Sequence, residues 1–247
     1  DDIVTIDIDT DTIEKYDKEF DKATTLAEKG KTSEAKQLFK SLIEKNPSIS
    51  EFHRNYGQLL EIEGKFEESR DSLIDALKWD PRNKYALLMM GNIYAKRFND
   101  FETGKKFYNE VLSIDPNDYM ALCSIGAVYA NYGKFEEAEQ YLNLSDSINN
   151  TYPNTYYGLG LIYKFRKDYL KAFDYAVKAL RLSDSKAEIN RVSGSLLMEI
   201  SRLHAEENQN NEIYADFLNE ISEKTGKEVK IEQDEKLSSP AKVEEAE

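Results

Sequence analysis

Glycine recurs along this chain at a nearly constant interval. Glycines in similar settings are separated by 34, 35, 34 and 34 residues: Gly57, Gly91, Gly126, Gly160 and Gly194. Three prolines keep the same interval: Pro47, Pro81 and Pro116. The sequence Gly-Lys-Phe-Glu-Glu occurs at 64–68 and again at 133–137. A period this steady constrains the fold strongly, because each repeat forms the same small unit and buries its apolar face against its neighbours.

Each period holds two amphipathic helices. In the first, Tyr16, Phe20, Ala23 and Leu26 recur at steps of three and four residues, which is the spacing of one helix face. We expect Thr12 to cap this helix. The predicted pairs are 13–29 with 33–46, 50–63 with 67–79, 84–98 with 101–114, 118–131 with 135–148, and 153–166 with 169–182. Further helices are predicted over 186–207 and 211–224.

The pattern resembles the tetratricopeptide repeat family, whose 34-residue helix-turn-helix unit has small residues at positions 8 and 20 and proline near position 32. Five units fit: 16–49, 50–83, 84–118 with one extra residue before Phe101, 119–152 and 153–186. Position 8 is small in every unit: Ala23, Gly57, Gly91, Gly126 and Gly160. So is position 20: Ala35, Ser69, Gly104, Ala138 and Ala172. Two helices approach within about 8–10 Å only where such side chains are small.

The resemblance implies an all-α fold, a right-handed superhelical solenoid of five units closed by a C-terminal capping helix. We expect one elongated domain over 13–224, with the capping helices over 187–224. Residues 1–12 carry five Asp and no basic residue, and are predicted to form an acidic arm. Residues 225–247 have no aromatic residue and are predicted to be a disordered charged tail.

Charge and cysteine content limit the partners. The net charge of −14 and the lack of a Lys or Arg cluster argue against nucleic acid. No long apolar run occurs, so we expect no membrane insertion. The single cysteine favours a reducing compartment such as the cytoplasm and is also compatible with a periplasmic or exported protein. The sequence does not begin with Met, which leads us to expect a processed product or a fragment of a longer protein.

The inventory of reactive side chains does not predict an enzyme. His53 and Cys123 fall in the second and fourth units, on the order of 20 Å apart if successive first helices are about 10 Å apart. Asp7, Asp9 and Asp11 have the spacing of calcium ligands, but Thr12 stands where a calcium loop needs glycine. We therefore predict a non-catalytic protein without metal or cofactor.

The candidate site comes from the family resemblance, which implies that positions 2, 5, 6, 9, 12 and 13 of each unit line a concave groove. The residues so placed that we select for peptide binding are Arg54, Asn55, Gln58, Tyr85, Leu88, Met89, Asn92, Met120, Cys123, Tyr157 and Leu161. Met and Tyr adapt to apolar side chains of a bound peptide, and Asn and Gln can bond to its backbone. The alternative is that Tyr85, Leu88 and Met89 simply pack between neighbouring first helices.

These residues predict a protein-interaction scaffold or adaptor that holds a segment of a partner protein. A second interpretation is a regulatory or docking region of a larger enzyme or membrane-associated complex. A third is self-association, with the groove filled by residues 1–12 or by a second copy of the chain. The sequence identifies no particular partner, because this fold hosts many functions.

Overall fold

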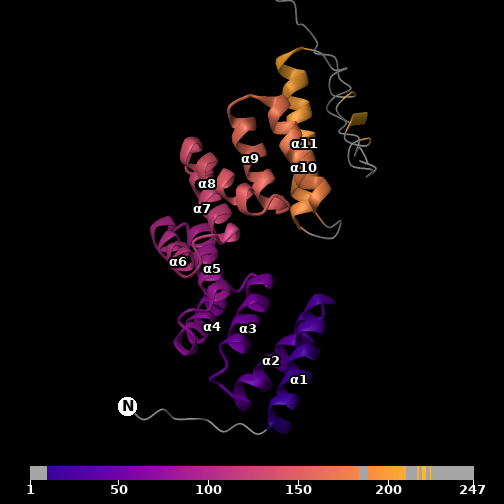
Figure 1. The fold of residues 1–247 in the computed structure, drawn as a ribbon. Helices are drawn as coiled ribbons and strands as arrows, with labels where there is room; N and C mark the ends of the chain where they lie inside the picture. The colour runs from indigo at the N-terminus through magenta and orange to yellow at the C-terminus, as the bar shows by residue number, and fades with distance from the viewer. Residues whose placement is uncertain (1–9, 184–187, 210–215, 217–218, 221–222, 224–247) are drawn as a thin grey trace, which may run out of the picture. The chain divides into compact units, whose positions relative to one another are not determined.

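The computed structural model describes residues 10–183, 188–209, 216, 219–220 and 223. Helices and short turns make up this part of the chain (Figure 1). The helices follow one another as pairs: α1 (Thr10–Glu28) with α2 (Thr32–Lys45), α3 (Ser50–Ile62) with α4 (Phe66–Trp79), α5 (Lys84–Asn92) and η1 (Ile93–Arg97) with α6 (Phe101–Ile114), α7 (Tyr119–Asn131) with α8 (Phe135–Ile148), and α9 (Pro153–Phe165) with α10 (Tyr169–Leu182). A further helix, α11 (Glu188–Glu207), follows them. The all-α prediction is confirmed.

The predicted helix bounds agree closely with those of the structure, and α6, α8 and α10 have the predicted ends. The prediction that Thr12 caps the first helix is wrong, because α1 begins at Thr10 and includes Thr12. The prediction placed the start of the helix where the apolar pattern begins, at Ile13. A helix needs no apolar residue in its first turn, so α1 can begin before that pattern. Residues 1–9, most of the predicted helix 211–224 and the predicted tail 225–247 lie outside the described residues.

Four of the helices are capped at their N-terminus by a residue with a short polar side chain. Asn83, Asp100 and Asp118 each accept a hydrogen bond at 3.0 Å from the backbone amide three residues later. Asp168 does the same at 3.3 Å. Each bond satisfies an amide that has no partner inside the helix, and this fixes where α5, α6, α7 and α10 begin.

The turns after the first helices use left-handed backbone. Gly30, Gly64 and Gly133 have φ of 73°, 76° and 71°. At the matching places in the third and fifth pairs, Asn99 and Lys167 have φ of 55° and 61°. Glycine adopts this conformation at little cost, which explains why the turn residue is usually glycine.

The one-residue insertion predicted before Phe101 appears as a π-helix. The helix that begins at Lys84 changes from α to π geometry over Ile93–Arg97 and then turns into α6. A π turn holds one more residue than an α turn, so it accommodates the inserted residue within the helix. Phe101 therefore still starts α6, as Phe66 and Phe135 start α4 and α8.

The small residues of the repeat lie where paired helices touch. A Cβ atom placed on Gly104 would lie 2.8 Å from the carbonyl oxygen of Gly91. A Cβ atom placed on Gly126 would lie 2.8 Å from Cγ of Leu142. Both distances are below van der Waals contact, so the expectation that a larger side chain would separate the helices is supported at these two positions.

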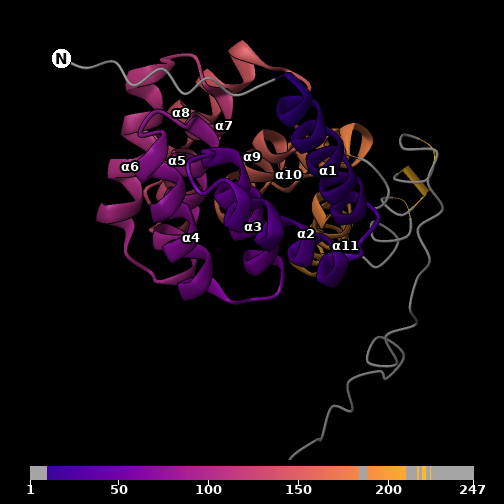
Figure 2. The ribbon, with the colours of Figure 1, turned by 90° about the horizontal axis from the view of Figure 1, so that it is seen from below.

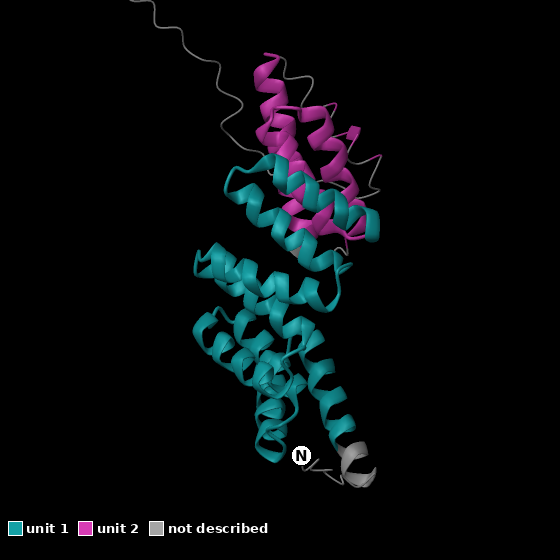
Figure 3. Cartoon of the chain, turned by 60° about the vertical axis from the view of Figure 1, so that its left-hand side comes forward, with its two compact units in different colours: residues 1–150 teal, residues 151–247 magenta. Residues whose placement is uncertain are grey.

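The backbone contacts divide the chain into two compact units, residues 1–150 and 151–247 (Figure 3). The sequence led us to expect one elongated domain. The division falls at the end of the fourth predicted repeat, and we describe each unit by itself. In the first unit α1, α2 and α3 lie side by side (Figure 2) and share a core that includes Phe39, Leu42 and Phe52.

The second unit contains α9, α10 and α11. Leu196, Leu197 and Ile200 of α11 pack against Phe173 and Val177 of α10 in one buried cluster. The apolar face of the α9–α10 pair is thereby covered by α11, as predicted for a capping helix.

Candidate functional site

The predicted binding residues of the first unit lie on three consecutive first helices, α3, α5 and α7. Contacts join α3 to α5 and α5 to α7. Arg54 of α3 and Tyr85 of α5 lie close together, with 5.8 Å between the guanidinium carbon and the ring centroid. The fold therefore brings together side chains that are 31 positions apart in the sequence.

Arg54 is held in place by its own helix. Its Nε and Nη2 atoms lie 2.8 and 2.7 Å from Oε2 of Glu51, and Nη1 lies 3.4 Å from Oε1 of Gln58. The other carboxylate oxygen of Glu51 accepts a hydrogen bond of 2.8 Å from Asn83, the cap of α5. Glu51 thus links Arg54 to the start of the next first helix. Two guanidinium nitrogens thus share one carboxylate oxygen, which restricts the orientation of the Arg54 side chain.

Tyr85 is the most accessible of the predicted aromatic residues, with 54% of its surface exposed. Gln58 is also exposed. The accessible part of the predicted site is therefore the edge shared by α3 and α5, where Tyr85 lies beside the Arg54 guanidinium. We call Arg54, Gln58 and Tyr85 the α3–α5 edge.

Other predicted residues are engaged inside the protein. Leu88 packs between the clusters formed by α5, α6 and α7, and Met89 packs against the cluster around Leu73 and Ile93. Asn92 accepts a hydrogen bond of 2.9 Å from the hydroxyl group of the buried Tyr108. These contacts favour the alternative interpretation of Leu88 and Met89 as packing residues.

Three further predicted residues have few atoms available to a partner: Asn55, Met120 and Cys123. The side-chain amide of Asn55 donates to the backbone oxygen of Glu51 at 2.8 Å. Met120 is half-buried. Cys123 has only 5% of its surface exposed, which corrects the expectation that it lines an accessible surface. The reason is that α7 is packed on several sides and buries seven of its thirteen residues.

Two charged residues at positions 12 and 13 of the repeat were left out of the predicted site. Burial raises the pKa of Glu61, against the opposing effect of Arg97 and Lys96. Burial also lowers the pKa of Lys96, although this side chain on η1 reaches solvent. No ion pair or hydrogen bond between Glu61 and Lys96 occurs among the described residues. The sequence could have indicated Glu61 and Lys96 as candidates, because both fall at repeat positions that, by the family resemblance, line the groove.

In the second unit, the face of α9 that carries Tyr157 and Leu161 meets α11. Both side chains are half-buried and pack against the cluster of α10 and α11. They line a cavity of about 170 Å³ together with residues of α11. An ion pair of 2.9 Å between Lys164 and Glu199 joins the two helices. These two predicted residues therefore contact the capping helix.

Both histidines contact neighbouring groups of the protein. His53 has 7% of its surface exposed, and its Nε2 lies 2.7 Å from the backbone oxygen of Pro47, as expected for a structural residue. His204 packs beside the ring of Tyr169, with centroids 5.8 Å apart. Within the described residues, no three His, Cys, Asp or Glu side chains converge so that they could bind a metal ion. None of the described helices is both long and apolar enough to span a bilayer.

Two family models match consecutive parts of the chain. The model described as tetratricopeptide repeat matches residues 20–86, and the model described as TT21 fifth ARM repeats domain matches residues 84–192. Both describe helical repeats, and together they include all five predicted units in whole or in part.

Among curated proteins, the chain is similar to anaphase-promoting complex subunit 3 of Schizosaccharomyces pombe, with 24% identity over 149 residues, 60% of this chain and 22% of that protein. It is also similar to the probable UDP-N-acetylglucosamine–peptide N-acetylglucosaminyltransferase SPINDLY of Hordeum vulgare, with 26% identity over 148 residues, 57% of this chain and 16% of that protein. The chain thus spans less than a quarter of the length of these two relatives.

Among solved structures, the APC/C hetero-tetramer Cut9–Hcn1 has the same fold. The TM-score is 0.72 at 15% identity, and the match covers 87% of this chain and 41% of that chain. At this identity the likeness concerns the fold alone.

Proposed function

We propose that this chain, which belongs to the tetratricopeptide repeat family, is a non-catalytic adaptor that binds a segment of a partner protein at the α3–α5 edge. Proteins of this family are protein-interaction scaffolds and are generally non-catalytic. The finer assignment, to the edge formed by Arg54, Gln58 and Tyr85, is ours.

The observation that carries this proposal is the exposed ring of Tyr85 beside an immobilised guanidinium group. Tyr85 has 54% of its surface exposed, and the Arg54 side chain is held by Glu51 at 2.7 Å. Tyrosine and arginine dominate the energetics of protein interfaces, because they bury a large area and still make directed polar contacts. An ordered side chain also loses less entropy when a partner binds. The α3–α5 edge therefore has the residue types and the rigidity of an interface.

The experiment places a photoreactive benzoylphenylalanine at position 85 of the chain, and in a separate variant at position 132. Tyr132 is a matched control because it is 47% exposed at the end of a different first helix. We expect position 85 to crosslink a protein in a lysate of the source cells that position 132 does not crosslink. The captured protein, once purified, is then titrated against Tyr85→Ala and Tyr132→Ala variants.

We expect Tyr85→Ala to weaken binding of that protein by about tenfold or more, and Tyr132→Ala to leave it unchanged. Equal effects of the two substitutions would refute the α3–α5 edge as the site. Capture of a second copy of the chain alone would show self-association. Met89 is unsuitable for such a test, because it packs against the cluster around Leu73 and its substitution would also affect folding.

As a second candidate, we propose a docking or regulatory region of a longer protein. It is supported by the two curated relatives, which extend far beyond the part that matches this chain. The name of one of them, a glycosyltransferase, makes an enzyme context a specific possibility to test. Sequencing the complete reading frame decides this candidate, which fails if the frame encodes only the residues described here and short flanks.

A further inference from the structure

The connection between α9 and α10 differs from those of the other helix pairs. We call residues 164–171, which include the adjoining ends of both helices, the α9–α10 turn. Its left-handed position is Lys167, with φ of 61°, where the other pairs have glycine or asparagine. A side chain makes this conformation costly, so glycine would be more favourable there. The protein therefore has a lysine at a place where the backbone does not favour it.

The start of α10 also differs from the starts of the other second helices. The first turns of α2, α4, α6 and α8 each carry Glu, whereas the first turn of α10 has no acidic residue. Leu170 and Lys171 stand at the positions that Glu67 and Glu68 occupy in α4. The positive end of the helix dipole favours glutamate at these positions and disfavours lysine. Departures from local stability rules are typical of functional sites.

The α9–α10 turn exposes apolar surface together with positive charge. Phe165 and Leu170 each have 60% of their surface exposed. Lys167 is exposed, and its side chain has neither an ion pair nor a hydrogen bond among the described residues. Lys171 has 62% of its side chain exposed and lies 3.6 Å from Asp168, which is a weak surface pair. A partner that docks here buries two large apolar side chains and meets two accessible ammonium groups.

The positive charge of the α9–α10 turn is local. The turn contains one acidic residue, Asp168, and four basic residues: Lys164, Arg166, Lys167 and Lys171. Lys164 is paired with Glu199 at 2.9 Å, and the guanidinium carbon of Arg166 lies 5.5 Å from the centroid of the Tyr163 ring. At 0.15 M salt the Debye length is about 8 Å, so a ligand in contact with the turn responds mainly to these nearby charges. An acidic segment with apolar side chains is the complementary ligand.

One segment of this chain has that chemistry. Residues 1–9, the part of the acidic arm that precedes α1, contain four Asp, no basic residue and four apolar residues: Ile3, Val4, Ile6 and Ile8. The tail 225–247 fits less well, because four lysines are interspersed among its seven acidic residues. Nine residues extend at most about 30 Å, which restricts docking within one chain. Docking between two copies has no such limit.

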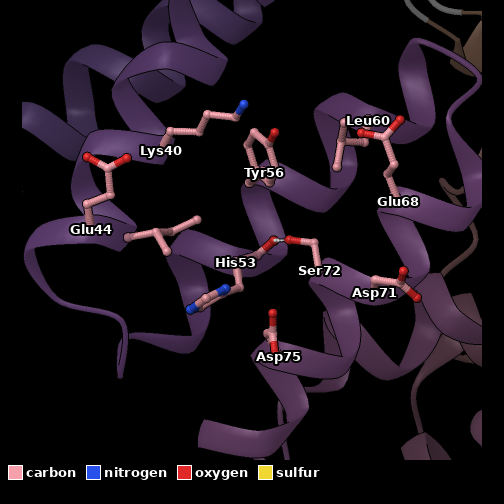
Figure 4. Close-up of a pocket in the computed structure, with 10 residues that line it drawn as sticks. Lys40, Glu44, His53, Tyr56, Leu60, Glu68, Asp71, Ser72 and Asp75 are labelled. Atoms are coloured by element: carbon pink, nitrogen blue, oxygen red, sulfur yellow. Dashed lines mark hydrogen bonds between the residues drawn. The ribbon is translucent and has the colours of Figure 1, made fainter.

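A cavity of about 500 Å³ between α2 and α4 does not suit this segment (Figure 4). His53 lines the cavity, together with one ammonium group, that of Lys40, and four carboxylates: Glu44, Glu68, Asp71 and Asp75. The hydroxyl group of Ser72 donates to the backbone oxygen of His53 at 2.8 Å, as the dashed line marks. An acidic segment is repelled by this cavity. At the α3–α5 edge, Arg54 is already paired with Glu51.

We propose that the α9–α10 turn docks residues 1–9 of a second copy of this chain. The apolar side chains of the segment cover Phe165 and Leu170, and its Asp side chains pair with Lys167 and Lys171. Each copy offers one segment and one turn, so the contact is heterologous and can propagate from copy to copy. The site shares no residue with the α3–α5 edge, so the two proposals stand or fall separately.

The first test gives the α9–α10 turn the residues that are usual in the other pairs. The turn variant carries Lys167→Gly, Leu170→Glu and Lys171→Glu in the full chain. Its melting temperature should rise, because glycine suits the left-handed position and Glu suits the first turn. A loss of association therefore cannot come from unfolding. In sedimentation equilibrium at about 0.15 M salt, the mass of the parent chain should rise with concentration, and the turn variant should associate at least about tenfold more weakly.

A second variant separates the contact from the overall charge. The arm variant carries Asp7→Lys with Asp9→Lys, which makes the net charge less negative by four, whereas the turn variant makes it more negative by four. Both variants should lose association. General repulsion between copies would instead change association in opposite directions in the two variants.

An equimolar mixture of the two variants tests the pairing of segment and turn. The arm variant keeps an intact turn, and the turn variant keeps an intact segment. The mixture should therefore form a complex of two chains, although each variant alone stays monomeric. Docking of the segment within its own chain would give no such complex and would overturn the proposal.

Three further results would also overturn it. The first is a parent chain that stays monomeric up to about 1 mM, the range of weak association. The second is equal association of the parent and both variants. The third is a loss of association in Tyr85→Ala, which would place the contact at the α3–α5 edge. If the parent is monomeric and floats with phosphatidylserine vesicles, and the turn variant does not, the α9–α10 turn contacts a lipid surface instead.

Discussion

Gly91 of α5 lies so close to Tyr108 of α6 that a Cβ atom on the glycine would be 2.4 Å from Cε1 of the tyrosine ring. Tyr108 is fully buried, and its hydroxyl group donates to Asn92, the residue after Gly91, at 2.9 Å. One aromatic side chain thus sets both the spacing of this helix pair and the position of a predicted binding residue.

Replacing Gly91 by Ala should destabilise the protein, because the new methyl group must displace the Tyr108 ring. Overpacking of this kind costs about 1–3 kcal/mol. The matched control is Gly194→Ala in the middle of α11, where a Cβ atom would meet nothing within 4 Å. That substitution should stabilise by about 0.5–1 kcal/mol through helix propensity. Urea unfolding of the two variants measures both effects, and equal free energies of unfolding would contradict the close contact.

Deleting Lys96 from η1 should be tolerated, because it removes the residue that the other repeats lack and converts the π turn to α geometry. Deleting Asn131, the exposed last residue of α7, removes a residue from a helix without an insertion and should cost about 2 kcal/mol or more. Thermal melts followed by circular dichroism compare the two deletions. A larger loss for the Lys96 deletion would show that the π turn is required for the fold.

Tyr108→Phe should destabilise the protein by about 1 kcal/mol near neutral pH, because the hydrogen bond to Asn92 is lost. Burial raises the pKa of Tyr108 above its ordinary value of 10.0. The unfolded chain therefore loses this proton at a lower pH than the folded chain. Above about pH 10 the parent protein should lose up to about 1.4 kcal/mol per pH unit through this group, and the Phe variant should not.

The free energies of unfolding of the parent protein and of Tyr108→Phe should consequently converge as the pH rises from about 9 to about 11. Urea titrations at several pH values measure this convergence. A constant difference across that range would mean that Tyr108 titrates normally and is not desolvated.

Cys123 should react slowly with a thiol reagent in the native protein and rapidly in denaturant, by a factor on the order of 100 or more, because its side chain is only 5% exposed. The control variant carries Cys123→Ser and Asn143→Cys, which moves the thiol to an exposed position of α8. Its thiol should react at nearly the same rate in both conditions. Fast native labelling at Cys123 would restore it to the accessible binding residues.

Much of the fold was predictable because it follows from local rules. The period of glycines and prolines gave the number of helix pairs, and the three- and four-residue steps gave their bounds. Even the place of the extra residue before Phe101 was correct, because the count between Gly91 and Phe101 exceeds that of the other repeats by one. The π form of η1 was not predicted, since a count shows that a residue is added but not how the backbone holds it.

The candidate site was less predictable, because access depends on neighbours that lie far away in the sequence. The repeat pattern predicted Arg54 and Cys123 equally as binding residues. In the structure Arg54 lies between Glu51 and Tyr85, whereas Cys123 is buried by packed helices. The pattern also predicted Tyr157 as a groove residue, but in the structure its side chain packs against the cluster formed with α11.

By itself the sequence determined the all-α repeat, the register of its helices and the small residues at their crossings. These depend on backbone hydrogen bonds and steric limits that act within one helix or between adjacent helices of a pair. Only the tertiary structure decided which helix faces are accessible to solvent. It also showed that Asn92 accepts a hydrogen bond from Tyr108 and that His53 lines an acidic cavity between α2 and α4. The burial and the electrostatic environment of a side chain depend on contacts with several helices that are far apart in the sequence. The repeat pattern of the sequence does not specify these contacts.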